Sequence, residues 1–116
     1  MNIEEFRQFC ISKPGVTEEF PFGPETLVFK VEGKIFALTG LDNPVFEVNL
    51  KCDPEYAEVL REEYPAVRPG YHMNKKHWNT VNFEGGLSEE LLEKLVNHSY
   101  ELVVKSLPKS KREKLI

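Results

Sequence analysis

The spacing of apolar residues near the N-terminus predicts an amphipathic helix. Ile3, Phe6 and Phe9 fall on one face when the chain is wound at 3.6 residues per turn. Asn2 is a favourable N-cap, and the stretch "SKPG" at 12–15 holds the proline and glycine that end helices. We therefore expect a helix between these two signals.

Alternation of apolar and polar residues then predicts three strands. The stretch "TLVFKVEGKIFALT" at 26–39 alternates on both sides of Glu32-Gly33, and two turn residues with glycine second are typical of a tight hairpin. A third alternating run, "VFEVNL" at 45–50, follows the turn-forming "LDNP". Together these segments predict an antiparallel meander.

Start and stop signals mark the elements of the second half. One helix is expected between the N-cap Asp53 and Pro65, and a longer one between the cap Ser88 and Pro108. Between these helices, "AVRPG" and "HWNTVNFEGG" are typical of short strands. The closing stretch "KSKREKLI" is expected to be a basic tail.

The resulting order, α-β-β-β-α-β-β-α, predicts an α+β fold in two layers. An antiparallel sheet with helices on one face is the economical packing for this order, and the other face is then partly open to water. No repeat or linker divides the chain. We therefore expect one domain over 1–108, followed by the basic tail at 109–116.

The composition is that of a soluble globular protein. Hydrophobic residues make up 41% of the chain and charged residues 29%. No apolar run approaches the ~18 residues of a membrane span, and the acidic first residues do not resemble an export signal. Two cysteines are too few for a disulfide framework. We expect a cytoplasmic monomer with reduced thiols and no membrane partner.

The charges are unevenly distributed along the chain. The net charge is −4, but residues 1–64 hold 6 Lys+Arg against 13 Asp+Glu, whereas residues 65–116 hold 9 against 6. The first part therefore carries −7 and the second +3. Because salt screens charges beyond ~10 Å, a basic surface on an acidic protein can still bind a polyanion at short range.

Neither a metal site nor a catalytic site is indicated by the residue spacings. His72 and His77 lie five apart, and no cysteine or histidine elsewhere completes a zinc-ligand pattern. Cys52 precedes a predicted helix, whose dipole would lower its thiol pKa, but no catalytic signature surrounds it and a buried cysteine is the commoner outcome. The glycines form neither a Walker loop nor a dinucleotide fingerprint. We expect no enzyme, no metal and no cofactor.

The stretch "PGYHMNKKHWNTV" at 69–81 is rich in basic and aromatic residues and holds no acidic one. If Val81 and Phe83 face the helices, alternation turns Trp78 to the open face, where its indole offers a stacking surface. Nearby cations could contact phosphates: Arg68, Lys75 and Lys76. The alternative is that Trp78 caps the edge of the core through a bulge, with Tyr71 and His72 in loop hydrogen bonds.

The basic end of the chain also has two interpretations. It can simply keep the chain end soluble, or it can act as an electrostatic arm that folds over a phosphate backbone. Only Glu113 opposes its cations, which are Lys105, Lys109, Lys111, Arg112 and Lys114.

Four stretches together resemble the MmcQ/YjbR family of small bacterial proteins. They are "FPFGPETLVFKVEGKIFAL", "NLKCDPE", "PGYHMNKKHWNTV" and "SYELVVKSLPK", which run in order from Phe20 to Lys109. The resemblance implies an α/β domain related to the CyaY-like (frataxin) and secretion-chaperone-like folds. It also implies DNA binding through a double-wing arrangement of hairpins. A frataxin-like iron role is not indicated, because Glu4 and Glu5 are too few for a carboxylate ridge.

Carried over to this chain, the resemblance places one wing at the hairpin that turns at Glu32-Gly33. Its tip carries Lys30 and Lys34. The second wing would be the segment that holds Lys75, Lys76, His77 and Trp78.

Our leading hypothesis is a non-enzymatic DNA-binding protein that mainly contacts the phosphate backbone. The expected contacts are Arg68, His72, Lys75, Lys76, His77, Trp78, Lys109, Lys111 and Arg112. The alternative is a module that binds a small molecule or a protein partner on its open sheet face. A concave aromatic cleft around Tyr71, His72 and Trp78 would favour that alternative, and a convex basic ridge would favour DNA. A chaperone-like surface would instead show an exposed apolar patch.

Overall fold

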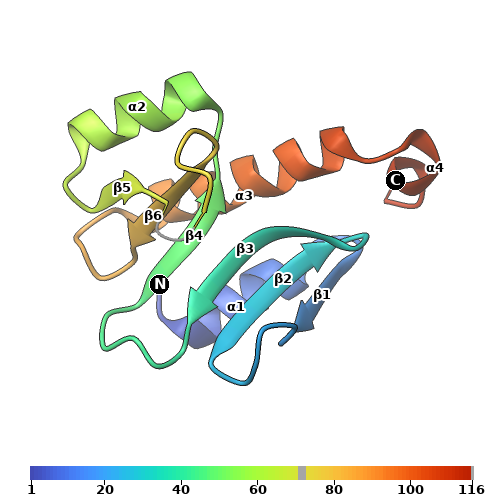
Figure 1. Ribbon diagram of the computed structural model, residues 1–116, viewed down its shortest axis with the longest axis horizontal. Coiled ribbons are helices and arrows are strands. Elements are labelled where there is room, and N and C mark those ends of the chain that lie inside the picture. Colours follow the sequence, from blue (N-terminus) through green and yellow to red (C-terminus); the bar gives the residue numbers. More distant parts are fainter. Residues whose placement is uncertain (71–72, 116) are drawn as a thin grey trace.

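The computed structural model describes residues 1–70 and 73–115, which fold as a two-layer arrangement of sheet and helices (Figure 1). In chain order the elements are α1 (Ile3–Ile11), β1 (Val16–Glu19), β2 (Thr26–Val31), β3 (Lys34–Gly40), β4 (Glu47–Lys51), α2 (Pro54–Glu63), β5 (Val67–Pro69), β6 (Trp78–Asn82), α3 (Glu89–Ser106) and α4 (Lys109–Glu113). The strands form one antiparallel sheet in the order β1-β2-β3-β4-β6-β5. The α+β class expected from the sequence is confirmed.

The predicted helix caps are present in the structure. The side chain of Asn2 accepts a hydrogen bond from the backbone N–H of Glu5, whose own carboxylate accepts from the N–H of Asn2. This reciprocal pair satisfies two donors that would otherwise be unpaired at the helix start. Asp53 and Ser88 cap α2 and α3 with one side-chain acceptor each, for the N–H groups of Tyr56 and Leu91, and without a reciprocal bond.

The hairpin between β2 and β3 has the turn that the sequence predicts. Glu32 and Gly33 have φ angles of 46° and 86°. Two positive φ values at the centre of a two-residue loop fit the right-handed twist of the flanking strands. Glycine meets this requirement without strain, whereas Glu32 adopts the left-handed region despite its side chain.

Two elements of the structure were not expected from the sequence. Strand β1, with the sequence VTEE, pairs with β2 along the edge of the sheet. Residues 109–113, expected to belong to a tail, form the short helix α4. Its Lys111 Nζ donates to the Glu32 carbonyl at 3.4 Å, so α4 lies against the β2–β3 turn.

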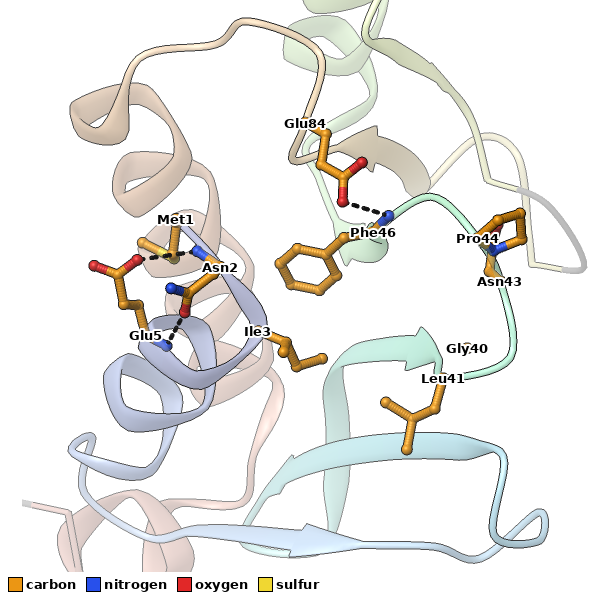
Figure 2. A pocket seen from close by; sticks show the side chains of 10 residues that line it. All are labelled: Met1, Asn2, Ile3, Glu5, Gly40, Leu41, Asn43, Pro44, Phe46 and Glu84. Atoms are coloured by element: carbon orange, nitrogen blue, oxygen red, sulfur yellow. Dashed lines mark hydrogen bonds between the residues drawn. The ribbon is translucent and has the colours of Figure 1, made fainter.

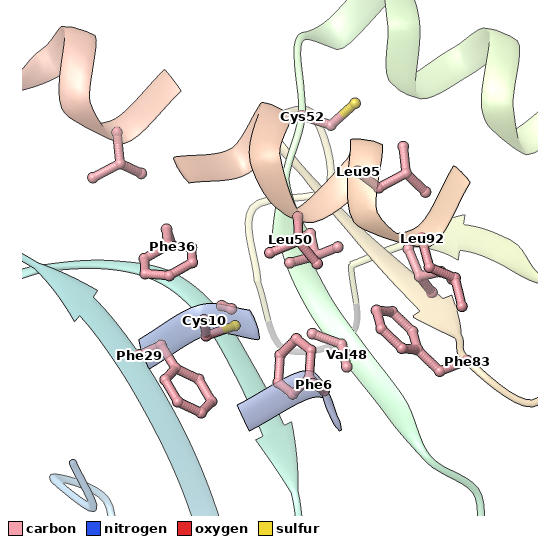
Figure 3. Packing of buried hydrophobic residues seen from close by; sticks show 14 of the residues in the cluster. Phe6, Cys10, Phe29, Phe36, Val48, Leu50, Cys52, Phe83, Leu92 and Leu95 are labelled. Carbon is pink, nitrogen blue, oxygen red and sulfur yellow. The ribbon is translucent and has the colours of Figure 1, made fainter. Parts of the chain in front are cut away.

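The core lies between one face of the sheet and the inner faces of α1, α2 and α3. Phe6 is fully buried at its centre, and its ring meets those of Phe29, Phe46 and Phe83 edge to face at 5.4–5.6 Å. Figure 3 shows Phe6 and Phe83 in this cluster with both cysteines. The helices therefore cover one face, as expected, and leave the other partly exposed.

The sheet is weakly joined between β3 and β4, where only Ala37–Leu50 and Leu38–Asn49 are in register. Ser99 of α3 bridges the two strands beyond this point. Its Oγ accepts from the Lys51 N–H at 2.9 Å and donates to the Phe36 carbonyl. A helix side chain thus replaces a backbone bond, and β4 diverges from β3 in Figure 1.

None of the helices in the described part of the chain is both long enough and apolar enough to span a bilayer.

Candidate functional site

The expected site residues fall into two groups at opposite ends of the molecule. The first lies around β5 and the start of β6, on the left in Figure 1, and the second around the β2–β3 turn and α4, on the right. We call the first group the tryptophan patch and add Lys51 to it. The patch consists of Lys51, Arg68, Lys75, Lys76, His77 and Trp78. His72 and Tyr71 lie outside the described residues.

Trp78 lies on the face of the sheet that the helices leave free. Val81 on the same strand and Phe83 directly after it are 1% and 5% exposed within the core. The pairing of β4 with β6 runs without a register shift from Glu47–Asn82 to Lys51–Trp78. Because side chains alternate along a strand, Trp78 points to the opposite face and is half-buried. The alternative of a bulge that returns it to the core edge is wrong.

Lys51 is a member of the patch that sequence reasoning missed. It lies directly opposite Trp78 in the β4–β6 register, so the two side chains are cross-strand neighbours. The predicted strand ended at Leu50, one residue too early. Had the predicted strand been extended past Leu50, alternation would have placed Lys51 on the same face as Glu47 and Asn49, which is also the face of Trp78.

Arg61 of α2 fixes the turn that carries the patch lysines. Its guanidinium donates to Asn79 Oδ1 at 2.7 Å and to the carbonyl oxygens of Lys75 and Trp78. Lys75 Nζ in turn donates to the Gly70 carbonyl at 3.2 Å. The backbone before β6 is therefore held against α2 by one side chain. The role of Arg61 could not be predicted from local sequence patterns, because its hydrogen-bond partners lie 14 to 18 residues away along the chain.

The positively charged side chains of the patch differ in whether a carboxylate already pairs with them. Arg68 forms an ion pair with Glu47 on the neighbouring part of the sheet, so part of its charge is already compensated. Within the described chain, by contrast, no hydrogen bond or ion pair engages the Nζ atoms of Lys51 and Lys76. The side chain of Lys76 is also exposed. Lysines therefore provide most of the free positive charge beside Trp78.

The β2–β3 hairpin engages both of its lysines within the protein. Lys30 Nζ forms an ion pair with Glu19 at 3.2 Å, and Lys34 Nζ donates to the Ser106 carbonyl at the end of α3. The turn itself is anchored by the Glu32 N–H, which donates to the Gly15 carbonyl at 3.2 Å. This hairpin packs against the C-terminal part of the chain instead of projecting as a separate arm.

A hollow of about 660 Å³ lies between the end of α3 and α4. We call it the α4 groove; its lining consists of Pro14, Tyr100, Val104, Lys105, Lys109, Arg112, Glu113 and Leu115. Lys109 and Arg112, expected as backbone contacts in a tail, are thus at the rim of a hollow. Lys111 instead contacts the β2–β3 turn.

A second hollow, of about 640 Å³, lies between the start of α1 and the connection from β3 to β4 (Figure 2). Its carboxylates are Glu5 and Glu84, and both accept backbone hydrogen bonds, from Asn2 and Phe46. The hollow therefore has an acidic lining, which is unfavourable for a phosphate.

Both cysteine thiols are protonated at neutral pH. Burial raises the pKa of Cys10 to about 12 and that of Cys52 to about 11, and the Asp53 carboxylate adds to the rise at Cys52. Burial and the capping carboxylate outweigh the α2 dipole at Cys52, and the expectation of a buried cysteine is confirmed. Within residues 1–70 and 73–115, no three His, Cys, Asp or Glu side chains gather as a metal site.

Comparison with known proteins shows extensive similarity. The YjbR family model matches residues 11–102. The chain is 42% identical to "Uncharacterized protein YbdF" of Escherichia coli O157:H7, covering 97% of this chain and 92% of that one. It is 38% identical to "Uncharacterized protein YjbR" of Escherichia coli K12, covering 100% and 98%. The crystal structure of Deinococcus radiodurans protein DR2400 superposes with a TM-score of 0.91 at 42% identity, covering 98% of this chain and 87% of that one.

Proposed function

Since the chain belongs to the YjbR family, we propose that it is a DNA-binding protein that contacts its ligand through the tryptophan patch. The observation that carries the proposal is the pairing of Lys51 with Trp78 on the helix-free face of the sheet. We propose a non-enzymatic role in the cytoplasm, without a cofactor.

The geometry of the patch suits an unpaired strand of DNA. Bases in a duplex are already stacked on one another, whereas a single strand can place a base on an exposed indole. Lys51 lies opposite Trp78 in the β4–β6 register, and Lys75 and Lys76 precede Trp78 in the turn before β6. A base on the indole would therefore have its phosphates within reach of these ammonium groups.

The overall negative charge limits the strength of this interaction but does not prevent it. The chain carries −4, so it repels a polyanion at long range. At physiological salt the Debye length is about 8 Å, so a phosphate at the patch mainly senses the adjacent lysines. We expect weak binding that depends steeply on salt.

The cations of α4 are not needed for this mode of binding. Lys109, Lys111 and Arg112 lie at the far end of a molecule whose longest dimension is 39 Å. Contacts from them, and from His72, stay a prediction for longer strands. Arg68 is expected to contribute less than the lysines because Glu47 already pairs with it.

A salt titration with labelled oligo-dT and a matched duplex tests the proposal by fluorescence anisotropy. Between about 50 and 300 mM salt, three phosphate contacts on a single strand give a slope of about −2 in log K against log salt. Lys76→Ala is expected to reduce the slope by about 0.7, one contact. Lys94→Ala, an equal charge change on the exposed face of α3, is the control and should leave it unchanged.

The absence of binding to either DNA at about 50 mM salt would refute the proposal. So would an equal loss of slope in the Lys76 and Lys94 variants, because the charge would then act only through the net charge of the protein.

A further inference from the structure

The α4 groove combines an apolar floor with a basic rim. Tyr100 and Val104 of α3 form the floor together with Pro14 and Leu115. The volume of about 660 Å³ lies within the range of small-molecule sites, roughly 300–1,000 Å³. Such sites are mostly apolar, with a few polar groups that orient the ligand.

The rim carries an excess of positive charge. Lys105, Lys109 and Arg112 line the groove against one carboxylate, that of Glu113. Lys109 pairs with Glu113 at 3.9 Å, but both side chains are exposed and such a pair is weak. Within the described residues, Lys105 and Arg112 have no ion-pair partner. The rim therefore presents two uncompensated cations beside an apolar surface.

The groove is held in place by three contacts between parts of the chain that are distant in sequence. The Tyr100 hydroxyl donates to the Pro14 carbonyl at 2.7 Å, which fixes the loop after α1 against α3. On the far side, Lys111 Nζ holds α4 to the Glu32 carbonyl. Leu115 packs against Gly15, where an added Cβ would clash with its Cδ2 atom. The α4 wall is thus part of the fold.

We propose that the α4 groove binds a small amphiphilic anion, an alkyl chain or similar apolar body that ends in a carboxylate or phosphate. The apolar part would lie on Tyr100, Val104 and Leu115, and the anionic head would meet Lys105 and Arg112 at the rim. A neutral or cationic amphiphile gains the same apolar contacts but not the charge contacts. Charge complementarity therefore selects the anion.

The test is a titration of the whole chain with decanoate, followed by the backbone amide NMR signals. We expect saturable shifts at Tyr100, Val104 and Leu115, with little change at Lys51 and Trp78. Decyl phosphate should bind to the same residues, and its affinity relative to decanoate identifies the preferred head group. Decanol and decylammonium, which keep the chain and lose the negative charge, should bind more weakly.

Two matched variants separate recognition by the rim from general charge effects. Arg112→Gln is expected to weaken decanoate binding by about three- to fivefold, as for the loss of one partly exposed ion pair. Lys114→Gln makes the same charge change two residues away, outside the groove lining, and should leave the affinity unchanged. Both positions are exposed, so neither change should disturb the fold.

Three outcomes would overturn the inference. In one, decanol or decylammonium binds as tightly as decanoate. In another, the groove signals shift on simple dilution, which would mean that a second copy of the chain occupies the groove. In the third, oligo-dT shifts the same amides and decanoate displaces it, which would assign the α4 cations to DNA. Failure of DNA binding at the tryptophan patch would leave the decanoate result unaffected.

Discussion

The tryptophan patch and the α4 groove both present lysine and arginine side chains, but the surfaces beside these cations differ. At the patch, Lys51 lies opposite one indole in the β4–β6 register, and Arg61 holds the turn that carries Lys75 and Lys76. At the groove, the cations rim an apolar hollow between two helices and a loop. A flat aromatic surface favours a planar base, whereas a hollow favours a ligand that can be buried. The neighbours of a cation, more than its charge, decide which anion it can bind.

Replacing Trp78 should give the largest difference between the two regions, because it should weaken DNA binding at the patch and leave ligand binding at the groove unchanged. Trp78→Ala removes the stacking surface, and stacking is worth about 1–3 kcal/mol per base, so single-stranded DNA should bind roughly five- to 150-fold more weakly. Trp78→Phe should retain part of the affinity. Decanoate binding at the groove should not change, as NMR titration of each variant would show.

Phe22 provides the control for loss of an exposed aromatic. It lies between β1 and β2 with 67% of its surface exposed, outside both regions. If Phe22→Ala weakens DNA binding as much as Trp78→Ala, the patch is not the binding surface.

Removing Arg61 should damage the support of the patch without affecting the groove. Arg61→Met leaves the buried Asn79 Oδ1 and the Lys75 carbonyl without their donor, whereas the Trp78 carbonyl keeps the Gly70 N–H at 2.8 Å. The free energy of unfolding should fall by about 1–3 kcal/mol. DNA affinity should also fall, because Lys75 and Trp78 lose their fixed geometry. Urea denaturation and anisotropy measure the two effects.

Lys94→Met replaces another cation by the same apolar residue on an exposed helix position and is the control for Arg61→Met. Equal destabilisation in the two variants would contradict the role given to Arg61.

Acidification should lower the stability of the fold on the patch side of the molecule, because His98 takes up a proton there. Burial lowers the pKa of His98 below 6.5, despite the opposing effect of Asp53 and Glu101, while Lys105 and Lys94 lower it further. Its Nε2 accepts the Asp53 N–H at 3.1 Å, which requires the neutral ring. The unfolded chain therefore binds the proton more readily, and the stabilisation present above pH 6.5 is lost as the pH falls.

Urea denaturation between about pH 7.5 and pH 5.5 measures this loss. His98→Gln, which keeps an acceptor but cannot titrate in this range, should flatten the pH dependence. An unchanged slope in this variant would show that other groups are responsible.

The smallest expected effect is a gain of DNA affinity when Arg68 is released. Glu47→Gln removes the carboxylate that pairs with Arg68 and should strengthen DNA binding by up to about fivefold. Glu90→Gln makes the same charge change at an exposed position on α3 and is the control. Anisotropy at constant salt measures both. A gain of equal size in the two variants would mean that Arg68 makes no specific contact.

Local signals in the sequence predicted much of this structure. Caps at Asn2, Asp53 and Ser88 and the turn at Glu32-Gly33 depend on residues within one turn of each other, and all are present. The orientation of Trp78 also followed from alternation once Val81 was placed in the core.

Features that depend on distant partners could not be predicted. Strand β1 is short and polar, and it exists because it pairs with β2. The five residues of α4 are too few to be helical alone, and α4 is held by the turn at Glu32. Arg61 and the pair of Arg68 with Glu47 join residues 14 to 21 apart in sequence. The sequence therefore indicated the patch but neither its support nor the hollow beside α4.

The emission of Trp78 tests the central claim most directly, because this is the single tryptophan of the chain. Titration with unlabelled oligo-dT should quench the emission in a saturable way as a base stacks on the indole, and added salt should reverse the quenching. The same titration with the Lys76→Ala variant should need more DNA for half-quenching. DNA binding that is visible by anisotropy but leaves the Trp78 emission unchanged would contradict the account.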